Sequence, residues 1–363
     1  MPTRRRLLLA AGAAAIAPGC LGGGSSAPPA STRTRPARLT GPLQVAAPAG
    51  SIPAGTTNAF ASAHGISVDA RTVATGADMV ALVSSGFAAD VVLARQDDIA
   101  VLGGLGLLSL LDHDRLPNLS LVDSEYLDLP FDRHNHWSAP ARYGVFGFGY
   151  RRGIIASAPV DWAGFFTAVR RYSQQGITML PGPVQPIAAA LAALDEDINT
   201  DDDSTLLRAQ ALLLSARPHL NAFTAVEVAP FGRGELVLAM GTNADFDRIF
   251  DWPGRSADTA FVLPQGRAEM WIDSWAVPVA ARNPATALAF IDFQLSARAA
   301  ARAWLGSRLP APEPAAAKLL PAAVRHDHRV ALDPTVVKRY QLADVTPQGL
   351  QKRAQIWERV VGA

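Results

Sequence analysis

A tryptophan and an aspartate two residues apart, Trp271 and Asp273, lie in one apolar stretch and could together hold a cationic ligand. Trp271, Asp273 and Trp275 are spaced two residues apart, so on a strand their side chains share one face. An indole ring attracts a cation over its face, and a carboxylate pairs with the cation directly. The same pattern also fits a core tryptophan beside a surface aspartate. The stretch therefore indicates a candidate site for a partly apolar cation, with a purely structural role as the alternative.

The residues around this candidate site predict alternating strands and helices. After the strand, Asn283 and Pro284 are typical of a helix N-cap and a first helical position, and apolar residues then recur at helical spacing up to Leu295. Elsewhere, short apolar runs bounded by turn residues predict strands, and periodic runs predict helices. We expect strands at 43–47, 66–68, 90–93 and 176–180, and helices at 58–64, 78–84, 187–194 and 205–215. This order is typical of an α/β protein.

Length and charge exclude some classes of function. The chain has 363 residues, of which 49% are apolar, and it carries a formal net charge of +1. A chain of this length can bury substantial cores and suits two lobes. The balanced charge gives no indication of nucleic-acid binding or of attraction to a general anionic surface.

The N-terminus has the features of an export signal. Arginines at 4–6 precede an apolar segment, Leu7–Ala17, which is too short to span a bilayer comfortably. Cys20, the only cysteine of the sequence, follows at once, as in bacterial lipoproteins, where this cysteine receives the lipid. We expect residues 1–20 to be a signal peptide with lipidation at Cys20; the alternative is an ordinary signal peptide. Residues 21–42 are rich in Gly, Ser, Pro and Thr and predict a disordered tether.

Several short segments occur in the order found in a known family. They are Ala89-Asp90-Val91-Val92, Leu129-Pro130-Phe131-Asp132, the run from Trp137 to Tyr150, the run from Phe231 to Gly241, Trp271-Ile272-Asp273 and Leu309-Pro310-Ala311-Pro312. In this order they resemble the periplasmic spermidine/putrescine-binding proteins, the solute receptors of ABC importers. The resemblance extends from residue 43 to residue 360 and rests on many short matches.

The resemblance implies an α/β fold with two lobes, the type II periplasmic-binding-protein fold. Each lobe would be a mixed sheet flanked by helices, with hinge strands between them. The first lobe would comprise 43–147 and 273–320, and the second 148–272 and 321–363. The implied partners are a polyamine or related amine, an ABC permease with its ATPase, and a membrane reached through the lipid anchor. We expect a monomer that binds no nucleic acid, cofactor or metal and is not an enzyme.

The resemblance also implies ligand-binding positions, and this chain keeps only some of the family's residues there. Trp271 and Asp273 match the family directly, and Gln341 falls near a ligand-contacting glutamine. Ser51 ends a segment that is Trp-Thr-Glu-Tyr in the family, and Thr242 stands where the second lobe supplies a tryptophan. The remaining substitutions are Arg95-Gln96-Asp97 for Ser-x-Tyr, Pro183-Val184-Gln185-Pro186 for Asp-x-x-Glu, and Leu309 for a tyrosine.

These replacements leave several classes of ligand possible. A polyamine buried without matching carboxylates would suffer a desolvation cost of several kcal/mol per ion. Asp273 can offset one charge and Asp97 another, whereas Arg95 would repel a polyamine and attract a carboxylate or phosphate. A zwitterionic or anionic solute, or a scaffold lipoprotein without transport, fits these residues as well. If Asp273 pairs with an ammonium group, Asp273→Ala should weaken binding at least about tenfold.

Other chemistries find little support in the sequence. The glycines between 144 and 149 lack the capped helix that a dinucleotide-binding loop requires. The sequence has no Gly-x-Ser-x-Gly elbow, and the histidine pairs at 134/136 and 326/328 lie in polar, turn-rich stretches. The aspartates at 201–203 lack EF-hand spacing and are expected to cap a helix.

Overall fold

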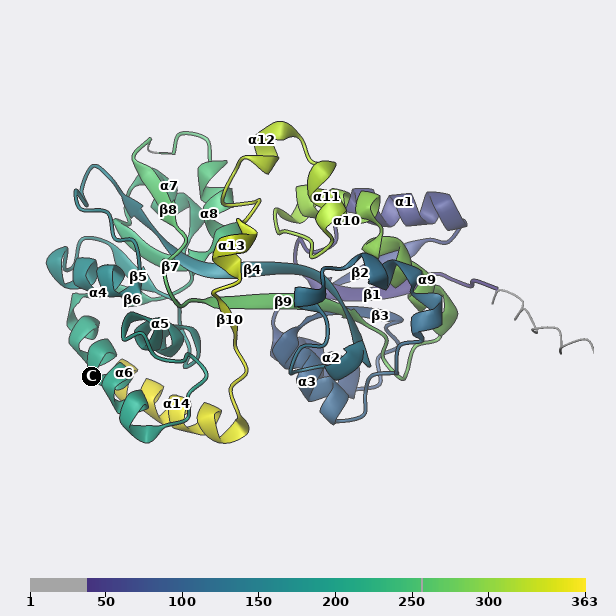
Figure 1. The fold of residues 1–363 in the computed structure, drawn as a ribbon, viewed down its shortest axis with the longest axis horizontal. Coiled ribbons are helices and arrows are strands. Elements are labelled where there is room, and N and C mark those ends of the chain that lie inside the picture. Colours follow the sequence, from purple (N-terminus) through teal and green to yellow (C-terminus); the bar gives the residue numbers. More distant parts are fainter. Residues whose placement is uncertain (1–37, 256) are drawn as a thin grey trace, which may run out of the picture. The chain divides into compact units, whose positions relative to one another are not determined.

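Two long strands, β4 and β9, connect the two halves of the folded chain (Figure 1). The structure, a computed structural model, describes residues 38–255 and 257–363. β4 (Ser138–Arg151) pairs with β9 (Glu269–Ala276) over its first half and with strands of the second group over its second half. All these pairings are antiparallel. The elements therefore fall into two groups, one at each end of β4.

The first group contains the start of the described chain. Its elements are β1 (Leu43–Pro48), α1 (Ala54–His64), β2 (Val68–Val73), α2 (Gly76–Ser84), β3 (Val91–Arg95), α3 (Gln96–Gly104), α9 (Pro284–Leu295) and α10 (Ala297–Ser307). The strand order β2-β1-β3 is parallel, and β9 continues it antiparallel to β3. The ring of Phe290 lies edge-on to Phe60 and to Trp275, with centroids 5.1 and 5.5 Å away. These aromatic contacts hold α1 and α9 on the sheet.

The second group is built on the far half of β4. Its elements are α4 (Trp162–Arg171), β5 (Ile177–Met179), α5 (Gln185–Ala193), α6 (Asp203–Ala216), β6 (Ala222–Phe223), α7 (Val228–Arg233), β7 (Leu238–Thr242), α8 (Asn243–Phe250) and β8 (Thr259–Val262). β7 lies between β4 and β5, and β8 also pairs with β4. Phe148 of β4 contacts Trp162 and Phe165 of α4, with centroids 5.4 and 5.2 Å away. The core of this half therefore lies between β4 and α4.

The last part of the chain lies against both groups. Its elements are α11 (Pro314–Lys318), α12 (Ala322–Arg325), α13 (Pro334–Val337), β10 (Gln341–Leu342) and α14 (Pro347–Val361). Short 3₁₀ helices elsewhere lie at His113–Arg115, Pro117–Leu121, Ser124–Tyr126, Arg133–Asn135 and Arg217–His219. The Trp304 indole of α10 donates to the carbonyl oxygen of Val330 at 3.0 Å, whereas β10 pairs with β9 and α14 packs on α6. This segment therefore connects the two groups a further time.

A charged pair also links the groups. Arg308, at the end of α10, donates from Nε and Nη2 to the two carboxylate oxygens of Asp247 in α8, at 2.7 and 3.0 Å. Asp247 is completely buried, whereas the Arg308 side chain keeps 27% of its surface exposed. Because this geometry is bidentate, it fixes the direction of both side chains.

The predicted strands and helices are confirmed; six of the eight have boundaries within two residues of the prediction, and two differ more. The strand expected at 66–68 runs instead over Val68–Val73, and the helix expected from Asn58 begins at Ala54. Gly65 ends α1 in the left-handed conformation, with φ of 68°, and Ile66 then turns into the core. The chain is therefore extended and paired only from Val68 onward.

The two predicted helix caps have different outcomes. Asp202 caps α6 as predicted, because its carboxylate accepts from the backbone N–H of Thr205 at 2.8 Å. The hydroxyl of Ser204 is the main cause that lowers the pKa of Asp202 to about 2. Asn283 does precede α9, but its side chain makes no cap bond and instead donates to Asp90 at 3.2 Å. The boundary was therefore right and its expected cap interaction was wrong.

Candidate functional site

The floor of the candidate site is formed by the adjacent strands β3, β9 and β4. The strand register places Arg95 of β3 and Arg142 of β4 on either side of Asp273 of β9. Residues directly opposite each other on paired strands point to the same face of the sheet. The three side chains therefore form a row across the floor, with a carboxylate between two guanidinium groups.

Asp273 is already paired with a cation of the protein. Arg142 Nη2 and Nε lie 2.6 and 2.8 Å from Asp273 Oδ2, and the two side chains are only 11% and 6% exposed. Nη2 of Arg142 also donates to the Ser51 hydroxyl at 2.6 Å. A β-bulge between Pro140 and Arg142 shifts the register of β4 here, and bulges re-aim side chains in this way. The carboxylate predicted to meet a ligand's ammonium group is thus bound by Arg142.

Arg95 contacts two further carboxylates. Its Nη2 lies 3.2 Å from Glu269 Oε1, and its Nε lies 3.1 Å from Asp97 Oδ1. The amide of Gln185 donates to the same Glu269 oxygen at 3.2 Å. Burial opposes the charge of Arg95, but Asp97, Glu269 and Asp273 outweigh it and raise its pKa. Burial raises the pKa of Glu269, with Arg95 acting in the opposite direction. Both arginines of the floor are therefore engaged by carboxylates of this chain.

Gly144 allows the Trp271 ring to lie across β4. A β-carbon at position 144 would stand 2.4 Å from Cζ2 of the indole, which is closer than non-bonded carbons approach. Trp271 is 8% exposed and belongs to the same core cluster as Phe146. Within the described residues, its buried Nε1 has no hydrogen-bond partner. The ring therefore packs in the core while leaving one donor unused beside the cavity.

Asp98 is a further acidic group at this site. It lies in the first turn of α3, next to Gly76, where a β-carbon would come within 2.5 Å of its carboxylate oxygens. Burial raises the pKa of Asp98 to about 6, the neighbouring Asp97 adds to this effect, and Arg95 opposes it. No ion pair of Asp98 occurs among the described residues. Its carboxylate is therefore the least compensated charge of the site.

These side chains surround a cavity of about 580 Å³. The lining includes the apolar residues Pro48, Val73, Met79, Leu93, Phe146 and Trp271 and the polar residues Arg95, Asp97, Asp98, Arg142, Gln185, Thr242 and Asp273. With Glu269 behind Arg95, four carboxylates face two guanidinium groups. When all are ionised, this leaves an excess of two negative charges, which favours cationic ligands.

Five of the seven predicted ligand-binding residues line this cavity: Arg95, Asp97, Thr242, Trp271 and Asp273. Thr242 ends β7 and caps α8, because its hydroxyl accepts from the backbone N–H of Asp245 at 3.2 Å. Ser51 reaches the site through its bond to Arg142. Gln341 is not brought together with these residues.

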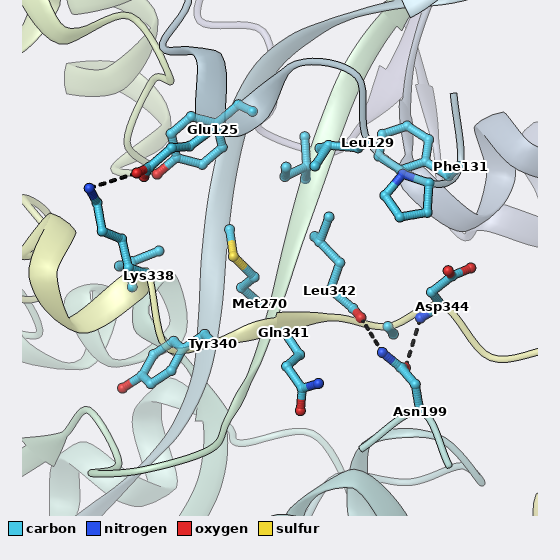
Figure 2. A pocket seen from close by; sticks show the side chains of 15 residues that line it. Glu125, Leu129, Phe131, Asn199, Met270, Lys338, Tyr340, Gln341, Leu342 and Asp344 are labelled. Atoms are coloured by element: carbon cyan, nitrogen blue, oxygen red, sulfur yellow. Dashed lines mark hydrogen bonds and ion pairs between the residues drawn. The ribbon is translucent and has the colours of Figure 1, made fainter. Parts of the chain in front are cut away.

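Gln341 lines a different cavity, of about 640 Å³, on the opposite face of β9 (Figure 2). Met270 and Ile272 belong to this second cavity, whereas Trp271 belongs to the first, as the predicted alternation along the strand requires. The amide nitrogen of Gln341 donates to Asp197 at 2.9 Å. Gln341 therefore binds other residues of the protein, away from the row on the floor.

Sequence reasoning missed Arg142, Asp98 and Glu269 as members of the site, and it named Gln185 only within a segment that differs from the family. Two of them carried a usable signal. Glu269 precedes Trp271 by two residues and so shares its strand face, and Arg142 is the one charged residue in the run from Ser138 to Tyr150. A charge in such a strand requires a partner, although the sequence does not indicate which carboxylate provides it.

Some predictions are not decided by this geometry. Cys20 and the signal peptide lie outside the described residues. Across 38–255 and 257–363, no three His, Cys, Asp or Glu side chains are grouped so that they could hold a metal ion. Over the same ranges, no helix is long and apolar enough to cross a membrane.

The curated relatives of this chain are bacterial binding proteins. A putrescine/cadaverine-binding protein of Pseudomonas aeruginosa is 30% identical over 230 residues, which is 61% of this chain and 65%, just under two thirds, of the relative. A spermidine/putrescine-binding periplasmic protein of Haemophilus influenzae is 22% identical over 329 residues, 86% of each chain.

Solved structures and a family model agree with these relatives. A spermidine/putrescine ABC transporter substrate-binding protein of Streptococcus pneumoniae superimposes with a TM-score of 0.81 at 20% identity, covering 88% of this chain and 98% of the other. This likeness confirms the predicted two-lobed α/β fold of periplasmic binding proteins. Residues 56–329 match the family model described as bacterial extracellular solute-binding protein. The chain therefore belongs to the family of bacterial extracellular solute-binding proteins.

Proposed function

We propose that this protein is the receptor of an ABC importer and captures a small amine of the polyamine type. The observation that carries the proposal is the cavity at Trp271, where an aromatic wall meets an excess of carboxylates. The indole and the Phe146 ring suit the methylene part of such a ligand, and Asp98 suits an ammonium group. The binding specificities in the names of the relatives point the same way.

The arginines of the floor argue against an anionic solute. Arg95 would attract a carboxylate or phosphate if it were unpaired, but it contacts Asp97 and Glu269. Arg142 is likewise bound to Asp273. A negatively charged ligand would have to displace these carboxylates and would then meet Asp98.

The mechanism follows from the two groups of elements. We assign 43–147 and 273–320 to the first lobe, and 148–272 and 321–363 to the second, with Val330 and its neighbours packed back on α10 of the first. Closure about β4 and β9 would bring Gln185 and Thr242 of the second lobe toward Asp98 of the first, around the ligand. The closed form would then be recognised by a permease with its ATPase.

The proposed cellular location depends on the N-terminal segment. We place the protein outside the cytoplasmic membrane, held by a lipid on Cys20 and by the tether predicted at 21–42. The last residues of this segment already belong to the folded part, because the backbone N–H of Thr40 donates to the Thr286 hydroxyl of α9 at 2.8 Å. We expect the protein to act at this location by binding and release, without a chemical step and as a monomer.

Putrescine and spermidine are expected to raise the unfolding midpoint of the purified protein. A ligand at about a hundred times its dissociation constant adds about 2.7 kcal/mol of stability, and thermal-shift measurements detect such a change.

Asp98→Asn is expected to weaken amine binding at least about tenfold, because the least compensated carboxylate is lost. The matched control is Asp69→Asn, an exposed aspartate of β2 outside the cavity lining. A shift with glutamate or phosphate and none with either amine would refute the proposal.

Amine binding is expected to weaken below about pH 6. The pKa of Asp98 is raised to about 6, whereas aliphatic amines stay protonated up to about pH 10. At pH 5 about one Asp98 in eleven is ionised, so the dissociation constant should rise about tenfold relative to pH 7. The stability of the unliganded protein has the opposite pH dependence. Asp98 binds its proton more tightly in the folded state than in the unfolded state, so its contribution to stability is lost as pH rises from about 4 to about 6. Calorimetric titration at pH 5, 6 and 7 measures the first effect, and an affinity as strong at pH 5 as at pH 7 would contradict it.

A further inference from the structure

Arg142 occupies the place where a cationic group of the ligand would be expected. Asp273 was predicted to pair with an ammonium group, and Ser51 was a predicted ligand-binding residue of the same site. Both are bound instead by Nη2 of Arg142, each at 2.6 Å. The guanidinium group therefore takes the position of a ligand cation while belonging to the protein.

The guanidinium group is a fixed part of the floor. The Arg142 side chain is 11% exposed, and its Nη1 adds a contact of 3.4 Å with the Ser51 carbonyl oxygen. The β-bulge between Pro140 and Arg142 sets the direction of the side chain from the backbone. Displacing the group would leave the buried carboxylate of Asp273 without a partner, which is strongly unfavourable.

We propose that Arg142 determines which amines the cavity accepts: it supplies one positive charge from the protein and so favours a diamine over a triamine. This inference rests on the proposed function, because it concerns the choice among amines. Arg142 acts through Asp273 and needs no direct contact with the ligand.

The charges around the cavity explain why a diamine would be preferred over a triamine. When Asp97, Asp98, Asp273 and Glu269 are all ionised, they exceed the charge of the two guanidinium groups by two. Two ammonium groups neutralise that excess. A third ammonium group would enter the cavity without a carboxylate to compensate its lost hydration. Without the charge of Arg142 the excess would be three, which suits a triamine.

Calorimetric titration of the purified protein with putrescine and with spermidine tests this proposal through the ratio of their dissociation constants. The wild type is expected to bind putrescine at least about tenfold more tightly than spermidine. Arg142→Gln keeps a hydrogen-bonding side chain without the charge and should shift the ratio at least about tenfold toward spermidine. Arg142→Lys keeps the charge and should retain the wild-type preference.

Asp273 provides the reciprocal control. Asp273→Asn removes a negative charge and should move the ratio away from spermidine. Combining it with Arg142→Gln removes one charge of each sign, so the wild-type preference should return. The double variant also leaves no unpaired buried ion, so it can be measured even if Arg142→Gln alone folds poorly.

An unchanged ratio in Arg142→Gln, or a wild type that prefers spermidine, would overturn the role of Arg142 while leaving the amine receptor intact. Binding of neither amine by any of these proteins would refute the proposed function, and the role of Arg142 with it.

Discussion

Replacing Trp271 by alanine should lower the free energy of unfolding by about 3–5 kcal/mol, as the loss of a buried tryptophan usually does. The ring is 8% exposed and fills the space that Gly144 leaves open on β4. Because it also lines the first cavity, amine binding should weaken at least about tenfold as well. Urea unfolding and calorimetric titration measure the two effects.

Trp252→Ala is the matched control for Trp271. This ring is 37% exposed and lies outside the lining of the first cavity, so its loss should have a smaller effect on stability and none on amine affinity. If Trp271→Ala were destabilised but kept the wild-type dissociation constant, Trp271 would be a core residue only.

The second large effect is expected for Arg308→Ala, which should lower the free energy of unfolding by about 3 kcal/mol. Asp247 would remain fully buried and charged without its bidentate partner. The value lies at the lower end of such losses because the Arg308 side chain is itself partly exposed. Position 308 has a left-handed φ of 61°, and alanine is strained there as arginine is, so the comparison isolates the side chain.

A double-mutant cycle separates this pair from other effects. Arg308→Ala combined with Asp247→Ala leaves no buried unpaired charge and should be more stable than the sum of the two single losses predicts. Arg233→Ala, in an exposed ion pair with Glu235, should leave the unfolding midpoint unchanged. Strictly additive losses at 308 and 247 would contradict a coupled pair.

The site residues that could be predicted lie close together in the sequence. Trp271 and Asp273 follow from an alternation of two residues, which the strand preserves. The charged row needed the order β3-β9-β4 and its register, and Arg142 lies 131 residues from Asp273. The bulge next to Pro140 also shifts the register by an amount that no local pattern indicates.

Gln341 was assigned to the ligand site from the family resemblance alone, and the structure places it in the other cavity. It lies on the two-residue strand β10, where register is set by few contacts. In the structure it pairs with Glu269, yet its side chain contributes to the second cavity. Because side chains alternate between faces, a shift of one residue decides which cavity such a side chain enters.

The overall fold was easier to predict than the ligand. The order of apolar strands and periodic helices was enough to indicate α/β lobes, since core positions tolerate many apolar residues. The ligand depends on a few charges and on which of them already neutralise each other. The residues around Asp273 in the sequence do not show whether its carboxylate is free or paired. The distance of 2.6 Å to Arg142 in the structure shows that it is paired.

β9 separates two cavities with a single layer of backbone, and this has a consequence for the ligand preference of the receptor. Met270 and Ile272 face the second cavity, but they share peptide units with Trp271, which faces the first. A change of volume at either residue shifts the backbone that carries the indole ring. Substitutions of Met270 or Ile272 are therefore expected to change the ligand preference of the first cavity, although neither residue lines it.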